Sequence, residues 1–151
     1  MKVYLDVCCL NRLFDDQRQL RVATETAAIE RLLERVAQGV LIDVSSAMAE
    51  AEIERMPDAD RRRKVSAMLP DVRRIMPLTD ALLDAAEKLR RAGFGLADAV
   101  HLAAAARWNV DVFLSVDDRL LRAAKRNRAK LSFRVLNPVA FLQELDDAVN
   151  E

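Results

Sequence analysis

The feature that most constrains the fold is a series of short, almost continuously apolar runs that alternate with longer amphipathic segments. Such runs are typical of strands that are covered on both faces of a parallel sheet. Strands are predicted at residues 3–5, 40–44, 111–115 and 133–136, with a weaker candidate at 74–76. Helices are predicted at residues 20–38, 46–56, 58–69, 79–91, 97–108, 117–128 and 138–149. This alternation predicts an α/β fold, with three α/β/α layers around a central parallel sheet of four to five strands.

Several helix boundaries are marked by individual residues. Gly39 is expected to end the first long helix, and Thr79 to begin a later one. Pro57 separates two short helices, while Pro138 stands where the first residue of the last helix should lie. The chain has only three glycines and no internal repeat or flexible linker. We therefore expect a single domain over residues 1–151.

Charge and cysteine content narrow the setting without defining a function. The net charge is zero, but basic residues gather at Arg61–Lys64 and between Arg119 and Arg134. Such runs form a solvated helix face in most proteins, or they follow the phosphates of a nucleic acid. Cys8 and Cys9 are adjacent and poorly placed for a disulfide. No signal peptide or membrane segment is evident, so a cytoplasmic protein is predicted.

Acidic residues follow three of the predicted strands or open the buried helix. The carboxyl ends of parallel strands meet at one edge of the sheet, where functional residues collect. The acids expected to converge there are Asp6, Glu50 or Glu52, Asp98, and Asp117 or Asp118. Clustered carboxylates repel one another and need a cation. Because Mg²⁺ and Mn²⁺ prefer oxygen ligands and the chain lacks a zinc-type Cys/His pattern, hydrolysis of a phosphodiester by a divalent metal is the indicated chemistry.

Each acid also has a structural interpretation. Asp6 could occupy a turn, and Asp98 could cap the helix that follows it. Ser115 and Asp118 have the spacing of a capping box, which would leave Asp117 free for chemistry. Spacing alone does not choose between Glu50 and Glu52.

The single histidine and the two cysteines are interpreted as supporting residues. His101 lies one turn after Asp98 and is expected to be structural, or to orient a carboxylate. A phosphatase loop would have Arg after five intervening residues, but Phe14 and Asp15 stand at the positions that Cys8 and Cys9 would require. Cys8 and Cys9 are therefore expected to be small buried groups beneath the site.

Three segments together resemble the PIN-domain family, and most closely its VapC-like toxin branch. They are Val3–Asp6, Gly95–Ala105 and Phe113–Leu121, in the family's order and spacing. The resemblance implies a Mg²⁺- or Mn²⁺-dependent endoribonuclease that forms a homodimer and is held inactive by an antitoxin protein. Its first, third and fourth acidic positions match Asp6, Asp98 and Asp117, the implied metal ligands, and its second favours Glu52 over Glu50.

One departure from the family pattern concerns the first strand. The family often has a hydroxyl residue and then Asn after the first Asp, whereas here Val7 and Cys8 follow Asp6. A hydroxyl that would support this turn is therefore missing.

The predicted function is that of a toxin ribonuclease with Asp6, Glu52, Asp98 and Asp117 as catalytic residues and RNA as substrate. A catalytically degenerate PIN-like interaction module is the main alternative. An aspartate-based phosphotransfer or phosphatase domain is the other, but it would want a second Asp two residues after Asp6, where Cys8 stands.

Overall fold

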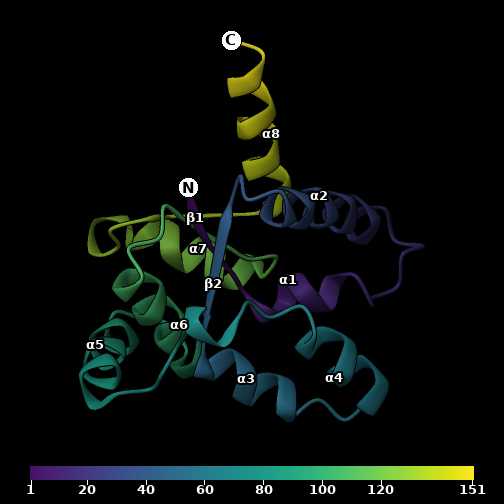
Figure 1. Ribbon diagram of the computed structural model, residues 1–151. Helices are drawn as coiled ribbons and strands as arrows, with labels where there is room; N and C mark the ends of the chain where they lie inside the picture. The colour runs from purple at the N-terminus through teal and green to yellow at the C-terminus, as the bar shows by residue number, and fades with distance from the viewer.

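A five-stranded, entirely parallel sheet forms the centre of the computed structural model, which describes residues 1–151 (Figure 1). The strands are β1 (Lys2–Leu5), β2 (Ile42–Ser46), β3 (Ile75–Met76), β4 (Val112–Leu114) and β5 (Arg134–Leu136). Their order is β3-β2-β1-β4-β5, so the chain builds one half of the sheet outward from β1 and then returns to build the other half. The order reverses between β1 and β4, where ligand sites of open α/β sheets form.

Helices cover both faces of the sheet, which confirms the predicted three-layer fold. The helices are α1 (Val7–Arg12), α2 (Leu20–Ala37), α3 (Ala47–Glu54), α4 (Ala59–Ser66), α5 (Asp80–Arg91), α6 (Leu96–Arg107), α7 (Asp118–Arg126) and α8 (Pro138–Val149), with short 3₁₀ turns at Val72–Arg74 and Arg128–Lys130. Gly39, at φ +76°, follows the end of α2, and the Thr79 hydroxyl caps α5 as expected. No helix is both long and apolar enough to span a membrane.

The two faces of β1 belong to two different hydrophobic clusters, because alternate side chains of a strand point in opposite directions. Tyr4 packs against α5, α6 and α7, where Phe94 and Leu102 are buried. Val3 and Leu5 pack on the other side, against α2 and α8. The alanine-rich α6 is buried along most of its length, as its composition predicts. These two clusters hold β1 in place and so position Asp6, the residue after the strand, at the edge of the sheet.

A third cluster lies beyond the carboxyl ends of the strands. It joins α1, α3 and α4 through Val7, Leu10, Ile53 and Val65. In Figure 1, α3 and α4 lie below the lower end of β2, at the edge toward which β1 and β2 run. This packing holds α3, the helix that carries Glu52, against the end of the sheet.

Two local predictions were wrong. The second strand begins at Ile42 rather than residue 40, because the Val40 amide still bonds to Arg35 O in the turn that ends α2. Its pairing with β1 starts at Lys2 opposite Ile42. The helix α1 was not predicted, because its apolar residues directly continue the apolar run of β1 and no period change is visible over six residues.

Candidate active site

Asp6 leaves β1 at the start of α1 but does not cap that helix. Its buried carboxylate instead accepts hydrogen bonds through Oδ2 from the Ser115 hydroxyl, at 2.9 Å, and from the Cys8 thiol, at 3.3 Å. Ser115 and Cys8 therefore supply the support that the missing hydroxyl after Asp6 would have given. Burial raises the pKa of Asp6, although His101 and Ser115 oppose this rise.

Asp98 lies in the first turn of α6, while Gly95 occupies the capping position. The Asp98 carboxylate folds back over Gly95, where an added Cβ would lie 3.8 Å from Oδ2. No helix N–H is capped by this side chain. Burial, followed by the nearby charges of Asp6 and Asp117, raises the pKa of Asp98 to about 6. Several carboxylates therefore act on one another in this region.

Asp117, not Asp118, caps α7, so the predicted capping box was wrong. Asp117 Oδ1 accepts hydrogen bonds from the Arg119 and Leu120 amides, and its second oxygen forms none. Ser115 Oγ accepts a bond from the Asp117 amide at 3.1 Å. Asp118 turns toward solvent and pairs with Arg21 at 2.7 Å. The side chains of the two neighbouring acids thus have different partners, the amides of α7 for Asp117 and Arg21 for Asp118.

Glu52 reaches the site, whereas Glu50 does not face it. Glu52 Oε1 lies 2.9 Å from His101 Nε2, and these two groups and a ligand atom of Asp6 all lie within 4.8 Å of one another. Glu50 lies in a groove between α3 and α4 with Arg62 and Arg63. The structure therefore places Glu52 beside Asp6.

His101 is the centre of a buried hydrogen-bond chain that joins α3 and α6 to β1 and β2. Its Nδ1 lies 2.6 Å from the Tyr4 hydroxyl, which in turn lies 2.7 Å from Ser46 Oγ. Burial disfavours the charged ring, but the bond to Glu52 and the charge of Asp6 outweigh it, so the pKa of His101 is raised. With both ring nitrogens engaged, His101 orients Glu52, as the sequence suggested. Tyr4 and Ser46, which complete the chain, were not identified from sequence.

The cysteines differ from each other. Cys9 is fully buried and donates to Leu114 O at 3.4 Å, as expected of a group beneath the site. Cys8 is only partly buried, and its sulfur touches both Asp6 and Ser115. Cys8 is thus a direct neighbour of the acidic group, which consists of Asp6, Glu52, Asp98 and Asp117, and does more than fill apolar space.

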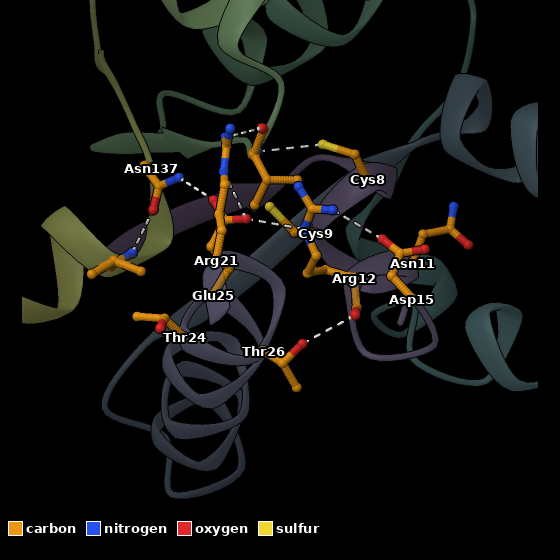
Figure 2. Close-up of polar contacts among 12 residues, drawn as sticks. Cys8, Cys9, Asn11, Arg12, Asp15, Arg21, Thr24, Glu25, Thr26 and Asn137 are labelled. Carbon is orange, nitrogen blue, oxygen red and sulfur yellow. Dashed lines mark hydrogen bonds and ion pairs between the residues drawn. The ribbon is translucent and has the colours of Figure 1, made fainter. Parts of the chain in front are cut away.

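A second polar network, around the buried Glu25, holds the segments next to the site (Figure 2). Glu25 Oε1 lies 3.1 Å from Arg12 Nε and 3.4 Å from Arg21 Nε, while Oε2 accepts a bond of 2.6 Å from Asn137. Arg21 also donates to Val116 O at 3.1 Å, directly before Asp117. The network therefore joins α1, α2 and α8 to the loop after β4. Its residues carry no motif, and the sequence did not reveal it.

The acidic group has the charge distribution of a cation site. Asp6, Asp98 and Asp117 form no ion pair with any Lys or Arg, and Glu52 pairs only with His101. Every other buried acid has a cationic partner, as Asp43 does in Arg74 and Glu25 in Arg12. Carboxylate oxygens are the preferred ligands of hard divalent cations. The chemistry of these donors therefore fits a divalent metal ion.

The metal-free protein should lose stability as the pH rises from about 4 to about 6. Asp98 is protonated more readily when folded, with a pKa of about 6, than when unfolded, with its ordinary value of 3.8. Its contribution is therefore fully present below pH 4 and is lost as the pH passes 6. Because water screens this half-exposed group, the loss should be about 1 kcal/mol.

Urea unfolding in EDTA across this pH range measures the effect. Asp98→Asn should flatten the curve by that amount, while the raised pKa of Asp6 maintains a residual slope of the same sign. The raised pKa of His101 changes stability only above pH 6.5. An unchanged curve in Asp98→Asn would contradict the assignment of this effect to Asp98.

Comparisons with known proteins give the family of the chain and a similar fold. The PIN domain family profile matches residues 3–126, and the chain therefore belongs to the PIN domain family. Among solved structures, the fold is similar to a chain in the crystal structure of VapBC2 from Rickettsia felis bound to a DNA fragment from their promoter. The TM-score is 0.59 at 12% identity, over 91% of this chain and 98% of that chain. The search of curated proteins gave no significant match.

Proposed function

We propose that the protein is a Mg²⁺- or Mn²⁺-dependent endoribonuclease, the toxin of a type II toxin–antitoxin pair that acts in the cytoplasm. The observation that carries the proposal is the group of carboxylates without a cationic partner at the switch point of a PIN-family sheet. Asp6, Asp98 and Asp117 are its proposed metal ligands. The similarity to VapBC2 supports an antitoxin partner as a further part of the proposal. A homodimer is proposed from the family resemblance alone.

The proposed mechanism divides the residues into two roles. The chemistry that a divalent ion would supply here is polarisation of the scissile phosphate and activation of a water molecule. Asp6 and Asp98 would hold the cation from the end of β1 and the start of α6, and Asp117 would contribute the oxygen that its cap leaves free. Glu52, fixed by His101, orients the attacking water and accepts its proton.

His101 is assigned to positioning although its Nε2 belongs to the tightest group of potential ligand atoms. That nitrogen is already bonded to Glu52, and Nδ1 to Tyr4. Mg²⁺ prefers oxygen to imidazole nitrogen, so the aspartates are the better ligands.

RNA cleavage by the purified chain tests the proposal. Single-stranded and hairpin RNA should be cut with Mn²⁺ or Mg²⁺ but not with EDTA, and Asp98→Asn should be inactive. Cleavage that persists in EDTA or in the variant would rule out the metal–carboxylate mechanism. Induced expression should slow bacterial growth for the unchanged chain and not for Asp98→Asn. A chain that cuts no RNA and leaves growth unaffected would instead favour the interaction-module alternative.

A further inference from the structure

A cleft of about 560 Å³ opens directly beside the acidic group. Its lining includes Cys8, Val116 and Asp117, which belong to the site or touch it. Arg12 at the end of α1, the turn between α3 and α4, and Arg61 of α4 also line the cleft. A strand bound with its scissile phosphate at Asp117 would therefore continue into this cleft.

The two arginines of the cleft are held in place by a shared acid. Asp15 pairs through Oδ2 with Arg12 Nη1, at 3.1 Å, and through Oδ1 with Arg61 Nη2. Arg61 Nε also donates to Asn11 Oδ1 at 3.1 Å. Figure 2 shows Arg12 between Glu25 on one side and Asn11 and Asp15 on the other. The planar guanidinium groups are thus oriented before any ligand arrives.

Each guanidinium keeps one nitrogen available. Arg12 Nη2 and Arg61 Nη1 have no hydrogen-bond partner, and neither is among the buried unpaired atoms, so both are open to solvent. Arginine is suited to phosphate because its fixed, fully charged fork donates in one plane. Two oriented forks with open donors form an oxyanion-binding arrangement next to a site that itself repels phosphate.

We propose that this cleft binds a phosphodiester of the RNA strand next to the scissile one, with Arg12 and Arg61 as the phosphate-binding residues. The inference rests on the proposed function and adds to it the path of the substrate. It also gives the four basic residues at positions 61–64 different roles, because only Arg61 lines the cleft. Arg63 and Lys64 pair with Asp60, and Arg62 donates to Met56 O.

Binding of a labelled single-stranded RNA tests this subsite independently of cleavage. Fluorescence anisotropy would be measured in the Asp98→Asn background, which prevents turnover, over a range of salt concentrations. Arg61→Ala should weaken binding about tenfold for any sequence, and it should reduce the slope of log K against log salt by about 0.7. Arg61→Lys should retain most of the slope. Arg63→Ala, on the same helix, is the matched control and should change neither quantity.

Asp15→Asn separates phosphate binding from a structural role of Arg61. If Arg61 acted only by joining α4 to α1, loss of its ion pair would weaken RNA binding as Arg61→Ala does. The proposal requires that the slope of log K against log salt be unchanged in Asp15→Asn, because both arginines and their charges stay in the cleft. Equal effects of Arg61→Ala and Arg63→Ala, a slope reduced in Asp15→Asn as in Arg61→Ala, or absence of RNA binding by the parent would overturn it. RNA binding without any cleavage by the unchanged chain would instead count against the proposed function alone.

Discussion

Asp6→Asn should reduce RNA cleavage by at least about a thousandfold without destabilising the metal-free protein. Loss of a metal ligand removes several kcal/mol of transition-state stabilisation, and each 1.4 kcal/mol corresponds to a factor of ten. The amide has the same shape, and its oxygen can still accept from Ser115 and Cys8. Unlike the carboxylate, the neutral amide is not repelled by the charge of Glu52. The unfolding free energy in EDTA should therefore be unchanged or higher by up to about 1 kcal/mol.

A second buried aspartate provides the matched control. Asp43, in β2, is as inaccessible as Asp6 but is paired with Arg74 at 2.9 Å. Asp43→Asn should lower stability, because it removes an ion-pair partner, and should leave cleavage within a few-fold of the unchanged chain. The two variants thus distinguish a carboxylate that binds a cation from one that stabilises the fold through an ion pair. A loss of stability in Asp6→Asn as large as in Asp43→Asn would contradict this assignment.

The architecture could be predicted from sequence because its strands and helices differ in period and because the helix ends carry clear markers. Residues such as Gly39 and Thr79 act locally, within one turn of the helix that they end or begin. The short α1 has neither a marker nor enough length to reveal its period. The predicted start of the second strand was two residues too early because the Val40 amide bonds to Arg35 O in the turn after α2. The pattern of side chains gives no sign of this backbone bond.

The candidate site could be predicted in part, for the same physical reason. Asp6 and Asp98 were selected because a parallel sheet brings strand ends together, and the structure places their carboxylates close enough for the charge of Asp6 to raise the pKa of Asp98. The error at Asp117 and Asp118 arose because both residues satisfy a capping pattern at this spacing. Asp118 instead turns outward and pairs with Arg21, which lies 97 residues earlier in the chain.

The network around Glu25 shows why the residues that support the site could not be predicted from the sequence. Its partners Arg12, Arg21 and Asn137 come from three different helices or their ends, and none stands in a recognisable motif. A glutamate in a helix with polar neighbours predicts an exposed position, yet the side chain of Glu25 is only 3% exposed. The cluster exists because the fold brings two cationic side chains onto one carboxylate.

Glu25→Ala should therefore be destabilising by about 2–3 kcal/mol. The loss would arise because Arg12 and Arg21 lose the buried carboxylate between them and Asn137 loses its acceptor, while Asp15 and Asp118 still pair with the two arginines. Glu30→Ala, at an exposed position of the same helix, should change the unfolding free energy by less than about 0.5 kcal/mol. Urea unfolding, followed by circular dichroism, measures both.

The double variant Glu25→Ala/Arg12→Ala tests whether the stability lost in Glu25→Ala comes from the charge that Arg12 no longer shares with Glu25. If it does, removing Arg12 as well should recover part of the lost stability, because a guanidinium then no longer lies beside an empty position. Simple addition of the two losses would show instead that packing dominates. Because Arg21 also bonds to Val116 O, next to Asp117, Glu25→Ala should weaken Mn²⁺ binding more than Glu30→Ala does, even where both proteins remain folded. Equal Mn²⁺ affinities in these two variants would mean that the network stabilises the fold without positioning Asp117.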